Sequence, residues 1–153
     1  MNYDREILRY HDKKVVMYIK VLLRVFGCHI DFHKMVRADV IGCFNTHPAW
    51  AIRVVLWGGY VEEIHELADN EFHGYYTKLR TIRPGFIGIV RPEFCHRLQR
   101  LRNGKASYSL WFRGPAIAPI LLRGDGWPRE LLDRSADDEG EFKCFGLLGE
   151  EER

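Results

Sequence analysis

His47 and His96 are the two residues of this chain whose type and placement could carry chemistry, because each lies directly after a turn, at the start of a predicted strand. Imidazole is a common ligand for divalent transition metals. An open metal site takes three or four His or carboxylate donors and leaves positions free for substrate. Two imidazoles fall short of such a set, so two interpretations stay open: a partial metal site, or two polar residues that line a binding pocket.

Three side chains near these histidines in sequence belong to the same question. Asn45 precedes His47 by two residues and offers a neutral amide oxygen, which binds transition metals less well than imidazole. Tyr60 and Glu62 follow a Gly-Gly pair and alternate with Val61, so they share one face of a strand. That face is either the interior, where both residues would bind a ligand, or the exterior, and the residues leave this choice open.

Short segments rich in β-branched and aromatic residues, separated by Gly and Pro turns, predict an antiparallel barrel or sandwich. The expected strands are 15–26, 29–37, 50–57, 60–64, 75–82, 86–90, 95–101, 107–113 and 117–122. Asn103-Gly104 predicts a hairpin turn. His33 lies on an alternating strand, in phase with His29 and Asp31, and we interpret it as a hydrogen-bonded strand histidine in preference to a third metal ligand. Helices are expected only near the ends, at 3–12 and at 128–136, where Pro128 suits a first turn.

Composition excludes several classes of protein. With 46% hydrophobic and 13% aromatic residues, the chain is not disordered. No run of about 18 uncharged apolar residues predicts a membrane-spanning helix. A charged N-terminus does not resemble a signal peptide, so we expect a cytoplasmic protein. Cysteines 28, 43, 95 and 144 form no C-x-x-C pair and predict buried free thiols. Phosphate-binding loops, G-x-G-x-x-G elements and nucleophile elbows do not occur.

Charge divides the chain into a basic body and an acidic end. Residues 128–153 carry four of the 23 Lys and Arg but nine of the 21 Asp and Glu, which leaves the rest of the chain strongly basic. The stretch 78–105 interleaves eight cations with aromatic residues. Such a mixture holds phosphates and stacks on bases, or it is an ordinary set of solvated strand faces. We keep a host protein and nucleic acid as alternative partners of the basic body.

The spacing around His47 and His96 resembles the two motifs of the cupin family. The first motif, G-x5-H-x-H-x3,4-E-x6-G, matches from His47 to Gly58, with Asn45 at its first His and Ala51 at its Glu. The second, G-x5-P-x-G-x2-H-x3-N, keeps Gly85 and His96, while Arg91, Glu93 and Arg100 replace its Pro, Gly and Asn. The resemblance implies a ligand set reduced to His47, His96 and Asn45, with one divalent metal (Fe, Mn, Ni or Zn) as the cofactor it would hold.

A closer resemblance covers most of the body. It rests on His33-Lys34-Met35, His47-Pro48, residues 56–63, Cys95-His96-Arg97-Leu98, residues 109–115 and Gly126-Trp127, in that order. These stretches resemble small cupin-like proteins of bacteriophages and prophages. The chain departs from that group at Asn45 and at 118–122. The resemblance implies an all-β, cupin-type double-stranded β-helix (a jelly-roll barrel) with short terminal helices. The expected organisation is a helical segment 1–13, a barrel domain 14–127 and an acidic tail 128–153.

Three functions compete on these grounds. In the first, the barrel pocket binds a small anionic ligand of nucleotide or sugar-phosphate type, in one version as a phage factor acting on host defence. In the second, the domain is a metal-dependent oxygenase, isomerase or epimerase. In the third, it is an interaction module for protein or nucleic acid, or a homodimer, since cupins often dimerise through their sheets. The predicted ligand-binding residues are Asn45, His47, Tyr60, Glu62, His96 and Trp111. No catalytic residue is assigned.

Overall fold

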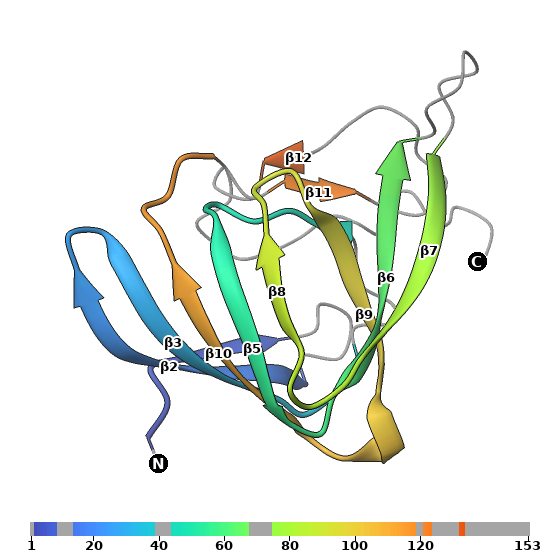
Figure 1. Ribbon diagram of the computed structural model, residues 1–153, viewed down its shortest axis with the longest axis horizontal. Helices are drawn as coiled ribbons and strands as arrows, with labels where there is room; N and C mark the ends of the chain where they lie inside the picture. Colours follow the sequence, from blue (N-terminus) through green and yellow to red (C-terminus); the bar gives the residue numbers. More distant parts are fainter. Residues whose placement is uncertain are drawn as a thin grey trace, which may run out of the picture.

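The computed structural model describes residues 2–8, 14–38, 44–67, 75–118, 121–123 and 132–133. Most of these residues lie in β-strands, and the others form the turns and loops between them. Two six-stranded antiparallel sheets face each other and enclose the core (Figure 1). None of the described helices is long and apolar enough to cross a membrane. An all-β domain is what the alternating patterns predict.

The two sheets are built from strands that are distant in sequence. Sheet A has the order β1 (Arg5–Leu8), β2 (Val15–Val25), β3 (Cys28–Met35), β10 (Ser107–Arg113), β5 (Ala51–Trp57) and β8 (Ile87–Val90). Sheet B has the order β12 (Leu132–Asp133), β11 (Leu121–Arg123), β4 (Phe44–Asn45), β9 (Cys95–Leu101), β6 (Tyr60–Leu67) and β7 (Tyr75–Ile82).

From β3 to β11 the chain crosses to the other sheet at every connection except the one between β6 and β7. This crossing between sheets explains why the predicted hairpin at Asn103-Gly104 is wrong. Asn103 and Gly104 do adopt the left-handed conformations expected of an Asn-Gly turn, with φ of 54° and 63°. However, they lie in the short 3₁₀ turn η1 (Arg102–Gly104) and join β9 of sheet B to β10 of sheet A, so the two strands do not form a hairpin.

The predicted terminal helices are also wrong where the structure describes them. Residues 5–8 of the expected helix 3–12 form β1, which pairs with β2 from Arg5↔Ile19 to Leu8↔Val15. Leu132 and Asp133 of the expected helix 128–136 form β12 against β11. Pairing with an open sheet edge satisfies the backbone groups that a short isolated helix would satisfy only weakly. The remaining residues of both segments lie outside the described part of the chain.

The cysteine prediction holds in part. Cys28 and Cys95 are free, and Cys95 is buried, but Cys28 is exposed beside the turn between β2 and β3. Cys43 and Cys144 lie outside the described residues.

The core lies between the sheets and forms two clusters. One joins Met35, Val55, Tyr60 and Ile82, and the other joins Ala51, Val90 and Trp111. Strand β5 shows how the pattern works: Ala51, Arg53 and Val55 point inward and are almost fully buried, while Ile52 and Leu56 are exposed on the outer face. An arginine therefore occupies the centre of a strand face that is otherwise part of the core.

Gly58 and Gly59 turn the chain from β5 into β6 and carry Tyr60 and Glu62 into the interior. Their φ angles are +77° and +99°, in the left-handed region that favours glycine. A Cβ on Gly58 would collide with the backbone carbonyl of Ala106, and one on Gly59 with that of Ile82. The β5–β6 turn therefore packs directly against the backbone at the end of β7 and against the backbone that precedes β10.

We expect Gly59→Ala to lower the free energy of unfolding by about 2–5 kcal/mol, because it combines a left-handed alanine with a backbone collision. Gly104→Ala is the matched control, since Gly104 also has a positive φ (+63°) but has open space around the added Cβ. The control should lose only about 1–2 kcal/mol. Urea denaturation of both variants measures the difference, and equal losses would contradict the packing argument.

Candidate functional site

A buried carboxylate, Glu62, organises the interior next to the predicted site. Its side chain is fully buried and accepts two hydrogen bonds from Arg53, Nη1 to Oε2 and Nη2 to Oε1, each at 2.7 Å. Arg80, from β7, donates from Nε to Oε1 at 2.7 Å. Arg53 also donates to the Tyr60 hydroxyl at 2.9 Å. The planar guanidinium of Arg53 thus forms a forked, charge-assisted pair that fixes Glu62 in one position.

His96 and His47 extend this network toward the pocket. His96 Nδ1 lies 3.0 Å from Glu62 Oε2, and His96 Nε2 lies 2.9 Å from His47 Nε2. An ionised carboxylate can only accept, so His96 donates from Nδ1 and its Nε2 keeps a lone pair. His47 must then donate from its own Nε2. The continuous chain Arg53–Glu62–His96–His47 therefore joins the core to the pocket wall with both histidines neutral.

Burial sets the ionisation of these groups. Burial lowers the pKa of His47 well below its usual value, and the neighbouring His96 and Arg53 lower it further. Burial also lowers the pKa of His96, against the opposing effect of Glu62. For Glu62, burial alone would raise the pKa, but the hydrogen bonds and charges of His96 and Arg53 outweigh it and hold the pKa well below 4.5. Burial raises the pKa of Tyr60 to about 12.

A cavity of about 210 Å³ opens between the sheets and exposes the ends of this network. One part of its wall is polar or aromatic and comes from Asn45, Thr46, His47, Tyr60, His96, Trp111 and His33. Another part is apolar and comes from Ile7, Val16, Met17, Ile19, Met35, Pro48 and Leu98. Asn45 lies opposite His96 in the β4–β9 pairing, which brings both to the same wall.

His33 is the unexpected member of this wall. It is 7% exposed and stacks on Trp111 with ring centroids 5.0 Å apart. Within the described part of the chain neither ring nitrogen has a hydrogen-bond partner, so the predicted hydrogen-bonded strand histidine is wrong there. Burial, together with the charges of Arg113 and Arg5, lowers the pKa of His33 to about 3. His33 is therefore neutral at ordinary pH, and the positive charges of Arg113 and Arg5 help to keep it neutral.

The charged residues that line the cavity are all arginines: Arg5, Arg37, Arg97 and Arg113. Arg113 donates from Nε to Asp31 at 2.6 Å. Arg97 pairs with Glu63, which lies opposite it in the β6–β9 pairing, so its charge is already compensated. Arg5 and Arg37 are exposed and form no ion pair with the described part of the chain. Among the described lining residues there is no Asp or Glu, so the cavity carries net positive charge.

Five of the six predicted site residues line the cavity: Asn45, His47, Tyr60, His96 and Trp111. The sixth, Glu62, lies behind them and bonds His96. The shared face of Tyr60 and Glu62, which the sequence left open, is the interior. Sequence reasoning missed Arg53, although an arginine in phase with Ala51 and Val55 was a detectable signal. It also missed Arg5, Arg37 and Arg113, whose local sequence has no distinguishing pattern.

The donor set does not fit the metal centre that the cupin motifs imply. Within the described ranges, no group of three or more His, Cys, Asp or Glu side chains is arranged to hold a metal ion. His47 and His96 supply two nitrogens, and each Nε2 is engaged with the other. At the acidic ligand position, Ala51 packs in an apolar cluster with Val90 and Trp111. Asn45 adds only a neutral amide, so the set falls short of the usual three or four donors.

Comparison with known proteins identifies solved structures that have a similar fold. No protein-family model and no curated protein matches the chain. Among solved structures, a mannose-6-phosphate isomerase-like protein of Ralstonia eutropha JMP134 matches with a TM-score of 0.51 and 18% identity, over 71% of this chain and 92% of that one. HppE in its iron(II) form matches with a TM-score of 0.52 and 11% identity, over 71% of this chain and 55% of that one. Vicilin from Corylus avellana (hazelnut) matches with a TM-score of 0.50 and 16% identity, over 65% of this chain and 29% of that one.

These neighbours have the cupin fold, and the chain shares it. The predicted jelly-roll barrel is therefore confirmed. The match spans a little over half of HppE and less than a third of vicilin, and at such identities it concerns the fold alone. The resemblance to phage-encoded proteins and the domain boundaries stay predictions.

Proposed function

We propose that this cupin-fold domain binds a small anionic ligand, of sugar-phosphate or nucleotide type, in the cavity between its sheets. The observation that carries the proposal is the charge of the lining: arginines are the only charged residues among its described members. Arg5 and Arg37 are exposed and have no carboxylate partner in the described chain. Guanidinium groups bind phosphate and carboxylate oxygens through pairs of charge-assisted hydrogen bonds.

The shape and polarity of the cavity narrow the ligand. Its volume of about 210 Å³ is below the ~300–1,000 Å³ typical of drug-sized ligand sites, which favours a sugar phosphate or mononucleotide over a dinucleotide. The apolar wall would cover the uncharged part of the ligand. The neutral side chains of Asn45 and of His47, through its Nδ1, can hydrogen-bond its hydroxyl groups without adding charge.

Calorimetric titration tests this proposal with inorganic phosphate, a hexose 6-phosphate, a nucleoside monophosphate and the free hexose. We expect the phosphorylated compounds to bind and the free hexose not to bind. Arg5→Ala and Arg37→Ala should each weaken binding about tenfold or more, the effect of losing a hydrogen bond to a charged group.

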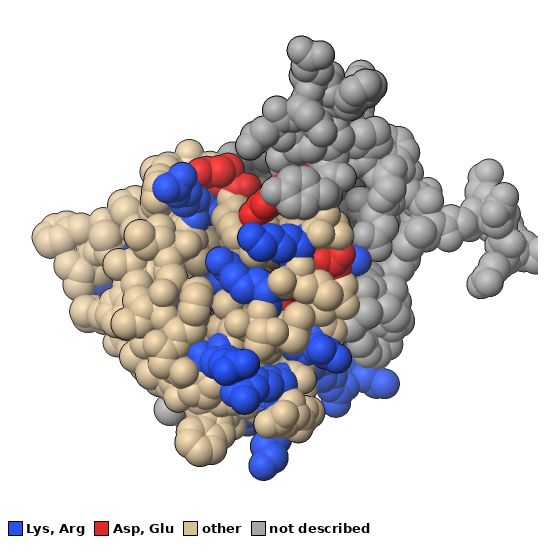
Figure 2. Space-filling model, turned by 45° about the vertical axis from the view of Figure 1, so that its right-hand side comes forward, with Lys and Arg blue, Asp and Glu red and all other residues tan. Residues whose placement is uncertain are grey.

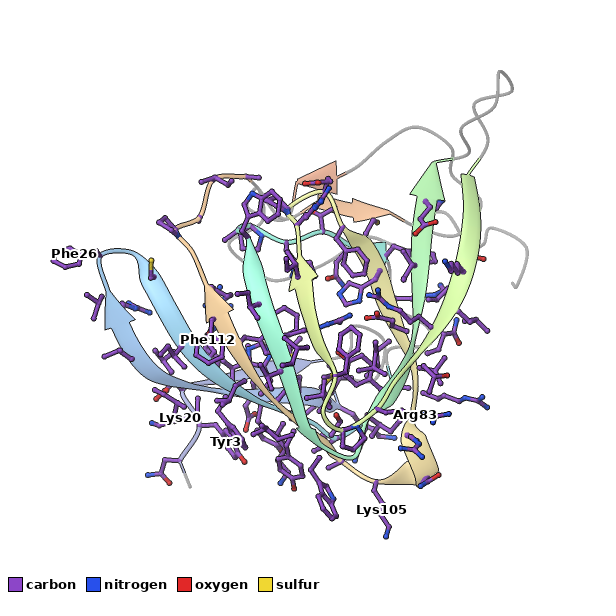
Figure 3. The ribbon with its side chains drawn as sticks, viewed as in Figure 1. Tyr3, Lys20, Phe26, Arg83, Lys105 and Phe112 are labelled. Atoms are coloured by element: carbon purple, nitrogen blue, oxygen red, sulfur yellow. The ribbon has the colours of Figure 1, made fainter. Side chains whose placement is uncertain are left out.

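Arg83→Ala is the matched control, because Arg83 is exposed and is not part of the cavity wall; Figure 3 labels it beyond the end of β7. Its affinity should equal that of the parent. Equal affinity for the free hexose and its phosphate, or binding that Arg5→Ala and Arg37→Ala leave unchanged, would contradict the proposal.

The other functions stay predictions of the sequence. Metal-dependent catalysis would need donors beyond His47 and His96, and no reaction step is derived for it. The interaction module retains some support, because Lys78, Arg83, Arg91, Arg100 and Lys105 are exposed, and Lys and Arg gather on one side of the view in Figure 2. Arg80 and Arg97 are less available, since they pair with Glu62 and Glu63. A role in phage action on host defence and a cytoplasmic location also stay predictions.

A further inference from the structure

His33 is a buried polar side chain whose hydrogen-bonding groups are unused within the described part of the chain. It is 7% exposed, and neither Nδ1 nor Nε2 has a partner there. Strand alternation places its imidazole on the inner face of β3, where it lines the cavity between the sheets. A buried polar group without a partner lowers stability, so it calls for a functional explanation. A ligand in the cavity would supply the missing partner.

An inward-facing row of residues across sheet A connects His33 to Arg5. In the strand pairings, Arg5 on β1 lies opposite Ile19 on β2, and Ile19 lies opposite His33 on β3. Strands β2, β3 and β10 lie side by side in Figure 1. Two strand spacings, about 10 Å, separate the backbones of Arg5 and His33. Both side chains line the cavity, so they can contact one ligand group from two sides.

Arg113 approaches the same part of the cavity from β10. Its Nε donates to Asp31 Oδ2 at 2.6 Å, and Asp31 is fully buried two residues before His33, on the same face of β3. This bond fixes the guanidinium, and within the described ranges no other hydrogen bond engages its terminal nitrogens. Arg113 and Arg5 are also the two charges that lower the pKa of His33, in keeping with their position near its ring.

A phosphoryl group matches these three donors. The neutral imidazole of His33 has one N–H donor, and guanidinium groups donate charge-assisted hydrogen bonds to phosphoryl oxygens. Arg5 supplies a charge that no carboxylate of the described chain compensates, whereas Asp31 compensates the charge of Arg113 and sets its direction. The terminal oxygens of a phosphoryl group point in different directions, so they can accept from three sides. A planar carboxylate offers only two oxygens.

We propose that His33, Arg5 and Arg113 form the subsite that holds the phosphoryl group of the ligand, with a ring N–H of His33 donating to a phosphoryl oxygen. This inference rests on the proposed function, because it assigns the position of the anionic group within the same cavity. Arg37 lies four residues beyond His33, about 13 Å along an extended chain, so it adds charge to the cavity outside this subsite. Asn45, on the other sheet, is left for the hydroxyl groups of the ligand.

Calorimetric titration of His33→Phe with a hexose 6-phosphate tests the proposal. Phenylalanine keeps the stack on Trp111 but has no donor, so the dissociation constant should rise at least tenfold. His65→Phe is the matched control, because His65 is a half-buried strand histidine of β6 that does not line the cavity. Its dissociation constant should equal that of the parent.

Nitrogen NMR of the parent protein with isotope-labelled histidine gives a second readout, which does not depend on the folding of a variant. Saturating inorganic phosphate and saturating hexose 6-phosphate should both shift the ring-nitrogen signals of His33. The free hexose should leave them unchanged. A shift with the ester but not with inorganic phosphate would overturn the proposal, because His33 would then contact the sugar.

The outcomes separate this inference from the proposed function. If no phosphorylated compound binds, both are overturned. If the hexose 6-phosphate binds the parent and His33→Phe equally well, or binds without shifting the His33 signals, the subsite is overturned while the proposed function stands. Equal losses of affinity in His33→Phe and His65→Phe would also overturn the subsite, because the substitutions would then act through the fold.

Discussion

Glu62→Ala is expected to lower the free energy of unfolding by about 3–5 kcal/mol, a large fraction of the ~5–15 kcal/mol of an ordinary domain. The substitution removes the carboxylate that accepts hydrogen bonds from Arg53, Arg80 and His96. Arg53 is 1% exposed and would stay charged in the core without a counterion. Urea denaturation monitored by tryptophan fluorescence measures the loss.

The double variant Arg53→Met/Glu62→Leu separates an unpaired charge from a loss of volume. Both charges are then replaced by apolar side chains of similar size, so most of the stability lost in Glu62→Ala should return. Asp4→Asn is the control on the surface, where the Lys20–Asp4 pair is exposed and little change is expected. A double variant as unstable as Glu62→Ala would contradict the view that unpaired Arg53 causes the loss.

Acidification is expected to destabilise the domain steeply below about pH 6.5, because the folded state holds buried neutral histidines. His33 has a pKa of about 3 in the folded state against 6.5 for an unperturbed histidine. Between these values the unfolded chain binds a proton that the folded chain does not, so stability falls as pH falls. The slope for one such group is about 1.4 kcal/mol per pH unit, and the loss from His33 is about 2–3 kcal/mol at pH 4.5.

Other groups of the site act in the same direction. Burial also lowers the pKa values of His47 and His96, so each adds to the loss below about pH 6.5. Glu62, with a lowered pKa, contributes stability that is present above pH 4.5 and is lost at lower pH. The measurement is the free energy of unfolding from urea titrations at pH 7.5, 6.0, 5.0 and 4.5.

His33→Phe tests the assignment to this residue. Phenylalanine keeps the stack on Trp111 but does not titrate, so the slope of stability against pH should become shallower by about 1.4 kcal/mol per pH unit. At pH 8 the variant should be as stable as the parent, because the replaced ring nitrogens have no hydrogen-bond partner among the residues that the structure describes. An unchanged slope would show that His33 is protonated in the folded state, or reaches water, in this pH range.

Local pattern was sufficient to predict most of the strands, whereas the ligand-binding role of the candidate site residues stays a prediction. Alternation identified β3 and β10, and Gly58-Gly59 correctly marked the turn between β5 and β6. The spacing of Asn45, His47 and His96 brought together residues that do meet at one wall of the cavity. The strand predictions succeeded because strand period and turn chemistry depend on residues that are close in sequence.

The order of strands in the two sheets determined the features that the sequence did not predict. Alternation assigns a side chain to a face of its strand, but it does not say which distant strands lie across from it. The contact of Glu62 with Arg53 and Arg80 joins β6 to β5 and β7, and the charge of the cavity comes from Arg5 on β1, Arg37 after β3 and Arg113 on β10. Likewise, five strands of sheet A align in register, and only this alignment places Leu23, Ile30, Phe112, Ile52 and Ile89 side by side on its outer face. The residue types of the candidate site were thus readable along the chain, whereas their partners, the charge of the cavity and the apolar outer face of sheet A follow from strand pairings between residues far apart in sequence.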